Sequence, residues 1–495
     1  MSRDAAVIRS QPVQQGTRAR KQLAFREPSF AFFAGFLVAN AAFAVLLVRY
    51  STLALAHIVL CVGIGSMFAM MGRYAHVAAV AAYITGVEVA YRMVEAPAPY
   101  EAGKYAVTIL FVFTILLMKR SKPHLAAISY FGLMMPSISM TLMAVGLTGS
   151  RMLLTSSLSG PLSLMASVWF FSNIKIKRQE LGVILGSYLA GALIPAVVAL
   201  FGIVTTQEPI LFNGESNPLM SGGFGPNQVS AILGLAAFLG FYAFLDTSRS
   251  GGLKALLLSL IVLFTAQCVL TFSRGGIYNA IGASMLACFF FARIPRIRNN
   301  IALAACVLAV LLGVVVLPRL NEFTGGMLAN RFENTDPTNR DLILLSHLNI
   351  WMQNFVFGIG PGVTGELENT STSHTEYVRM LAEHGLFGLC ALVLLGVMVS
   401  ANYRRSRGPR QKALSTSMMT WALLFMANAG MRLVAPSLIF GFGFATLAAD
   451  AMPLIQRRRA APPVASTSGR QRGNRACVSS DRWSDDTQAI SQRRV

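Results

Sequence analysis

The stretch LGVILGSYLAGALIPAVVALFGIV, residues 181–204, holds 24 consecutive residues without one charged side chain. A helix needs about 20 apolar residues to cross the hydrocarbon core of a bilayer. Similar runs recur along the chain, and they are continuous rather than alternating, unlike the strands of a membrane β-barrel. The sequence therefore predicts an all-α polytopic integral membrane protein.

Fourteen such runs predict about 14 transmembrane helices. They cover residues 29–48, 51–71, 74–93, 104–118, 125–147, 153–172, 181–204, 228–245, 255–271, 277–292, 300–317, 386–402, 413–431 and 437–453. The first run follows a basic segment, is too long for a cleaved signal and has no obvious cleavage site, so we interpret it as an uncleaved anchor. An even number of spans places both ends of the chain on one side of the membrane.

The composition supports this class and excludes others. Of the 495 residues, 54% are hydrophobic and only 13% are charged, against about 25% charged in soluble domains. That balance excludes a soluble enzyme, a secreted disulfide scaffold and a disordered chain. The six cysteines form no CxxC pair, so they predict neither a disulfide framework nor a zinc site.

The net charge of +21 follows the positive-inside rule. If both ends are cytoplasmic, the inner segments hold 32 Lys and Arg against 8 Asp and Glu, and the outer segments hold 10 against 13. This asymmetry explains the basic character without a nucleic-acid partner. It predicts that both termini lie in the cytoplasm.

The predicted organisation has five parts. Residues 1–28 form a basic cytoplasmic N-terminus, 29–317 a membrane domain of about 11 spans, 318–385 a large outer loop, 386–453 about three further spans, and 454–495 a basic cytoplasmic tail. The tail is rich in Ser, Arg, Gln and Pro, a composition typical of disorder. A loop of this length at 318–385 is typical of a functional or a disordered segment.

Arg274 is the first candidate site residue. It follows Thr271-Phe272-Ser273 and precedes Gly275 and Gly276, in a predicted outer turn between two spans. An arginine at this depth requires a partner or water, the glycines allow a close approach of the backbone, and a helix N-terminus favours an anion. These features favour anion binding, and the alternative is an arginine that snorkels to the interface.

The large outer loop supplies the other candidates. Arg340 opens an amphipathic stretch to Trp351, followed by Gly358-Ile359-Gly360-Pro361-Gly362, which can form a backbone nest for an anion. A second predicted helix begins near Ser371, Thr372 or Ser373 and ends at Gly385.

His374 lies in the first turn of that predicted helix. The positive helix end there favours the neutral imidazole that a general base requires. For the other histidines we expect structural roles: His57, His76, His124, His347 and His384.

These residues resemble the O-antigen ligase and O-antigen polymerase (Wzy-type) superfamily of bacterial membrane glycosyltransferases. The resemblance rests on the Ser273-Arg274-Gly275 turn with Gly222–Asn227 before it, on Arg340 ahead of Gly358-Ile359-Gly360, and on His374 followed by a run that ends at Leu389. It is strong over about 220–400. Many members carry Asn directly after the histidine, where this chain has Thr375.

The resemblance implies transfer of a glycan from undecaprenyl pyrophosphate to a sugar hydroxyl at the periplasmic face. It places the protein in the bacterial inner membrane. The acceptor is lipid A-core in a ligase or another lipid-linked repeat unit in a polymerase, and a free-standing exopolysaccharide polymerase is a third version of the same chemistry. It assigns the pyrophosphate to Arg274 and Arg340 and the general base to His374. Arg379 is a third pyrophosphate candidate, and a structural pair with Glu376 or Glu383 is the alternative for it.

Two further expectations follow from the residues. The predicted outer side carries no DxD motif or acidic cluster with metal spacing, so we expect arginines to neutralise the pyrophosphate without a metal or another cofactor. A lipid-linked oligosaccharide flippase or another polytopic transporter is the rival class. A transporter should show repeated halves and ionisable residues deep in its spans, whereas Glu88, the main such acid, lies near an outer end.

Overall fold

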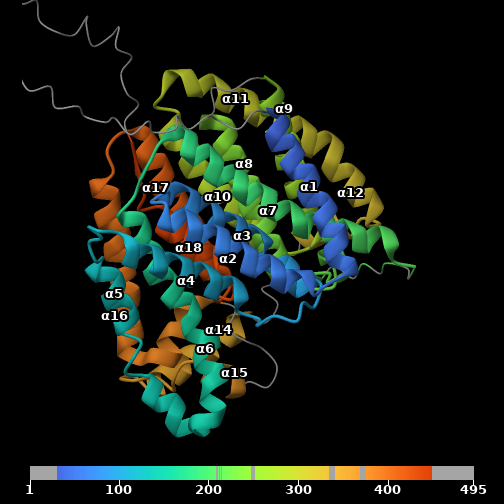
Figure 1. Cartoon of the computed structure of the whole chain (residues 1–495). Helices are drawn as coiled ribbons and strands as arrows, with labels where there is room; N and C mark the ends of the chain where they lie inside the picture. The colour runs from blue at the N-terminus through green and yellow to red at the C-terminus, as the bar shows by residue number, and fades with distance from the viewer. Residues whose placement is uncertain are drawn as a thin grey trace, which may run out of the picture. The chain divides into compact units, whose positions relative to one another are not determined.

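The computed structural model describes residues 30–207, 210, 212, 215–246, 251–333, 340–367 and 375–448, with the backbone alone for Arg340 and Leu367. The predicted basic N-terminus and the predicted tail from residue 454 lie outside these residues. Figure 1 shows the described chain as helices packed side by side. The all-α polytopic fold predicted from the apolar runs is confirmed.

Except at the runs 125–147 and 153–172, where the structure has a helix of 8 residues and one of 35 residues interrupted at Gly146, the helices follow the apolar runs in the first half of the chain. They are α1 Phe30–Arg49, α2 Leu53–Met70, α3 Tyr74–Met93, α4 Ala102–Leu117, α5 Leu125–Gly132, α6 Ile138–Ser172, α7 Arg178–Thr205, the short η1 Leu219–Ser221, α8 Pro226–Asp246 and α9 Gly251–Leu270. The second half holds α10 Arg274–Phe291, α11 Pro295–Val310, the π-helix η2 Leu311–Val316, α12 Leu317–Phe323, α13 Met327–Glu333, α14 Arg340–Gln353, α15 Val363–Leu367, α16 Glu376–Arg405, α17 Pro409–Asn428 and α18 Ala435–Phe442.

Eight of the described helices, counting the continuous stretch Pro295–Phe323 as one, are long and apolar enough to cross a membrane. The predicted outer loop at 318–385 contains α13, α14 and α15, and non-helical turns at 324–326 and 354–362 separate its helices. Its amphipathic stretch from Arg340 is α14, as the sequence predicts.

Small residues let the central helices approach closely. A Cβ on Gly191 of α7 would clash with the carbonyl oxygen of Tyr83 in α3, and a Cβ on Gly234 of α8 would clash with that of Gly276 in α10. Such small-residue contacts are typical of helix packing in membranes. Gly276, which the sequence suggested for close approach to a ligand, therefore serves the packing of α10 against α8.

The last predicted span is the main difference from the sequence prediction. The run at 437–453 predicts a membrane-crossing helix, but α18 has only 8 residues, and the chain then forms the strand β2 Thr446–Leu447. Strand β2 pairs in parallel with β1 Lys175–Ile176. The preceding helix α17 ends at Asn428, so residues 429–434 form an irregular segment between two helices.

Candidate active site

The turn between α9 and α10 holds Arg274 at the first position of α10. Ser273 donates a hydrogen bond to Asn227 Oδ1 (2.8 Å), and its carbonyl accepts one from the Ser230 hydroxyl (2.9 Å). Helix α8 therefore fixes the position of the turn. Phe272 is fully buried with φ +57°, which is rare for a residue with a bulky side chain. These contacts hold the half-buried Arg274 in a defined place.

Arg331 of α13 is a second cation at this turn, and the sequence analysis did not select it. Its Nε donates to the carbonyl oxygen of Phe272 (3.2 Å), and the residue is 9% exposed. Burial, and next the nearby charge of Arg274, lower the pKa of Arg331, while Glu215 raises it. Two guanidinium groups close to one turn form a place where an anion is favoured.

Arg379 forms the structural pairs that the sequence left open. Its guanidinium pairs with Glu376 and also with Glu383 (2.9 Å), and Glu383 accepts a further hydrogen bond from Thr364 (2.7 Å). Both glutamates are about 1% exposed or less. Because two carboxylates already neutralise Arg379, its charge stabilises the start of α16.

The glycine turn after α14 packs against α16 instead of presenting its N–H groups. Ile359 and Gly360 donate their backbone N–H groups to the carbonyl oxygens of Ala382 and Glu383, both at 3.0 Å. The turn docks where Gly385 interrupts α16 with φ +57°. Gly385, where the sequence predicts the end of a helix, is therefore a break within α16. The predicted anion nest is not supported, because two N–H groups of the turn already bond to α16.

The structure begins α16 later than the sequence predicted. Thr375 is the N-cap and accepts a hydrogen bond from the N–H of Tyr377 (3.3 Å), so His374 precedes the cap and does not lie in the first turn. His374 itself lies outside the described residues, as do Ser371, Thr372, Ser373 and the side chain of Arg340. Thr375 serves the helix as a cap.

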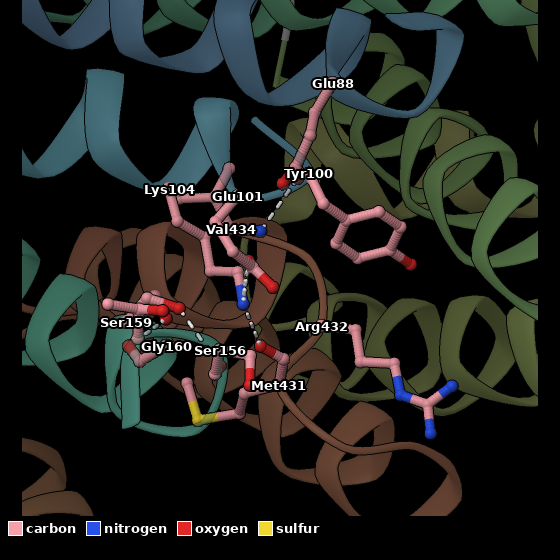
Figure 2. A network of polar contacts seen from close by, with 12 residues as sticks. Glu88, Tyr100, Glu101, Lys104, Ser156, Ser159, Gly160, Met431, Arg432 and Val434 are labelled. Atoms are coloured by element: carbon pink, nitrogen blue, oxygen red, sulfur yellow. Dashed lines mark hydrogen bonds and ion pairs between the residues drawn. The ribbon is translucent and has the colours of Figure 1, made fainter. Parts of the chain in front are cut away.

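The irregular segment 429–434 lies among these elements, and ionisable side chains form hydrogen bonds with its backbone. Met431 N–H donates to Glu376 of α16 (2.9 Å), and Val434 N–H donates to Glu88 of α3 (2.8 Å). Lys104 of α4 donates to the Met431 carbonyl (3.0 Å) and also pairs with Glu101, as Figure 2 shows. Non-helical backbone at membrane depth requires such partners.

Arg432 projects from this segment with its guanidinium turned away from Lys104 and Glu101 (Figure 2). Its carbonyl accepts a hydrogen bond from Arg92 (3.0 Å), and its side chain is half-buried. At the start of the segment, Asn428 donates to Asn279 of α10 (2.8 Å) and lies beside Gly275. The segment thus connects the Arg274 turn to the start of α16.

Comparison with known proteins adds the family. A family model described as O-antigen ligase matches residues 259–393. This match supports membership of the O-antigen ligase and polymerase superfamily. No curated protein matches it.

The O-antigen ligase match begins within α9 and ends within α16, so it contains the Arg274 turn, α13, α14 and the Arg379 pairs. It leaves out Arg92, Lys104 and the segment 429–434. The chain is thus a multi-pass membrane protein whose matched part is similar to a glycosyltransferase-type family, and residues beyond the matched part complete the surroundings of the site.

Proposed function

We propose that this protein transfers a glycan from undecaprenyl pyrophosphate to a sugar hydroxyl at the periplasmic face of the inner membrane. The acceptor is lipid A-core if the protein is a ligase, or another lipid-linked glycan if it is a polymerase. The observation that carries the proposal is the family match together with the arginines around one turn and one irregular segment: Arg274 and Arg331 at the turn, and Arg432 on the segment.

The chemistry needs two kinds of group. The bond between the anomeric carbon and the pyrophosphate oxygen breaks, and guanidinium groups stabilise the charge on the leaving pyrophosphate by paired hydrogen bonds. The acceptor hydroxyl forms the new bond to the same carbon and gives its proton to His374 as general base. In this proposal Arg274, Arg331 and Arg432 hold the pyrophosphate together with Arg340, and the arginines replace a metal ion. Arg379 is assigned to structure.

The test uses the purified protein in lipid nanodiscs with EDTA, with a lipid-linked glycan as donor and either lipid A-core or a second lipid-linked unit as acceptor. Transfer to one acceptor distinguishes a ligase from a polymerase. We expect His374→Gln to lower turnover by about 10²–10⁴-fold, since that is what a general base contributes. Activity should also fall at low pH, where imidazole is protonated.

The matched control is His384→Gln. His384 is 2% exposed within α16, so glutamine fills its place better than alanine would. We expect a small effect on turnover after correction for the amount of folded protein. Near-parental turnover of His374→Gln would show that another group is the base, and activity that EDTA abolishes and Mg²⁺ restores would overturn the metal-free mechanism.

A further inference from the structure

Two adjoining cavities lie where α3 and α4 are connected, outside the part of the chain that the family model matches. The first, about 170 Å³, is lined by Glu88, Arg92, Tyr100 and Phe224 among others. The second, about 330 Å³, is lined by Thr205, Gly222 and Gly223 among others. Glu95 lines both cavities, so they meet at this residue.

Tyr100 is an exposed aromatic ring that its neighbours hold in place. It is 48% exposed, and the Arg92 guanidinium lies 3.9 Å from its ring centroid. Gln228 donates a hydrogen bond to the Tyr100 hydroxyl (3.0 Å), and Arg92 Nε donates to its carbonyl (3.2 Å). An interfacial tyrosine that only anchors a helix does not need this fixation. A rigid, partly exposed ring beside a cavity is a platform for a ligand.

Glu95 supports a functional interpretation of the same place. It has φ +49°, one of only two positive values among the described non-glycine residues, and it is exposed. Backbone strain of this kind clusters at ligand sites, where the surroundings hold it. Glu95 is also the one residue that lines both cavities.

The lining matches the chemistry of a carbohydrate. A sugar ring presents C–H bonds on its faces, which pack on the negative face of an aromatic ring, and hydroxyls at its edge, which bond to carboxylates and guanidinium groups. The first cavity supplies aromatic faces in Tyr100 and Phe224 and an exposed carboxylate in Glu95, whereas Glu88 and Arg92 are already paired with each other (3.0 Å). A volume of about 170 Å³ is below that of drug-sized ligand sites and corresponds to a single ring.

Hydrogen-bonded residues also link the lining of this cavity to the proposed pyrophosphate site. Gln228, which holds Tyr100, directly follows Asn227, which accepts the hydrogen bond from Ser273 beside Arg274. From the other side, Arg92 donates to the carbonyl of Arg432. A sugar in this cavity would therefore lie next to a pyrophosphate held at the Arg274 turn.

We propose that the cavity at Tyr100 binds a sugar residue of the lipid-linked donor glycan. The assignment rests on the proposed function for the identity of the donor. The recognition itself depends on Tyr100, Glu95 and Phe224, none of which takes part in the proton transfer.

The experiment measures the affinity of the full-length protein in nanodiscs for two lipids. One is the lipid-linked glycan extracted from the protein's native host, and the other is undecaprenyl pyrophosphate without sugar. We expect Tyr100→Ala to weaken binding of the glycosylated lipid about tenfold and to leave binding of the sugar-free lipid unchanged. Tyr100→Phe, which keeps the ring, should stay within about threefold of the parent. Tyr50→Ala, at a tyrosine that is 56% exposed and lines neither cavity, is the matched control.

The outcomes separate the two proposals. Equal weakening for both lipids would make Tyr100 a structural residue, and unchanged binding of both would remove the sugar site. An unchanged donor affinity with a raised KM for the acceptor would also overturn the donor assignment. If the parent transfers no glycan but still prefers the glycosylated lipid in a way that depends on Tyr100, the proposed function fails and the sugar site stands.

Discussion

The candidate arginines of this chain have different structural partners. Arg379 faces two buried glutamates, whereas Arg274 lies at a helix start beside a second cation, Arg331. Lysine keeps the charge of arginine but loses its planar pair of donors. Replacement by lysine should therefore lower turnover at Arg274 and lower the stability of the fold at Arg379.

We expect Arg274→Lys to lower turnover at least tenfold with normal abundance in the membrane, because a bidentate contact to pyrophosphate is lost. Arg379→Lys should instead lower the thermal stability, because one ammonium cannot satisfy two buried carboxylates. Turnover per folded molecule and a thermal melt in detergent distinguish the two effects. If Arg274→Lys works as well as the parent, Arg274 is an interfacial charge only.

The sequence could select Arg274, Arg340 and His374, because each lies in a local pattern that chemistry explains. It could not separate the two roles of Arg379, and it did not find Arg331, Arg432 or Tyr100. Their partners are distant in the chain: Arg92 and Arg432, for example, are 340 residues apart. Contacts of that kind leave no periodicity or spacing in a single sequence.

At the scale of elements, hydropathy predicted where helices lie but not where one breaks. Residues 413–431 and 437–453 are apolar enough to predict two full spans, yet the chain leaves the helical path after Asn428. Buried charged groups on α3, α4 and α16 replace the hydrogen bonds that a helix would supply. The break therefore depends on ionisable residues elsewhere in the chain. A hydropathy scan registers these residues only as a lower local hydropathy.

Because the break depends on Lys104, we expect Lys104→Met to lower the stability of the protein strongly. Lys104 is fully buried, and its loss leaves Glu101 and the Met431 carbonyl without their partner. Breaking a buried pair typically costs about 3–5 kcal/mol, so the melting temperature and the membrane abundance should fall. The matched control is Arg319→Met, which breaks an exposed pair with Glu322 (3.3 Å) at the same spacing and should cost about 0–1 kcal/mol. Equal melting temperatures for both variants would contradict this role of Lys104.

At the scale of the whole molecule, the charge asymmetry predicts the orientation in the membrane. We expect Asn213, Asn334 and His374 on the periplasmic side, and Lys177, Arg298 and Arg407 in the cytoplasm. Single cysteines at these positions in a cysteine-free background, treated with an impermeant thiol reagent in intact spheroplasts, test the orientation. Labelling at 407 without labelling at 334 would invert it and remove the proposed mechanism.

The contact between Lys104 and the Met431 carbonyl also has a consequence for how the protein is made. The two residues are 327 positions apart, so at 5–20 residues per second the ribosome needs roughly 16–65 s to deliver the second after the first. During that interval α3 and α4 are already synthesised, while the backbone groups that satisfy Glu88 and Lys104 do not yet exist. Only the pairs of Lys104 with Glu101 and of Glu88 with Arg92 can form by then. Pairs that lack their remaining hydrogen-bond partners are unfavourable in lipid, so these early helices must wait beside water, an insertion factor or a provisional neighbour. A nascent chain that stops before residue 428 should therefore be a substrate for membrane quality control, however many of its helices have already been inserted.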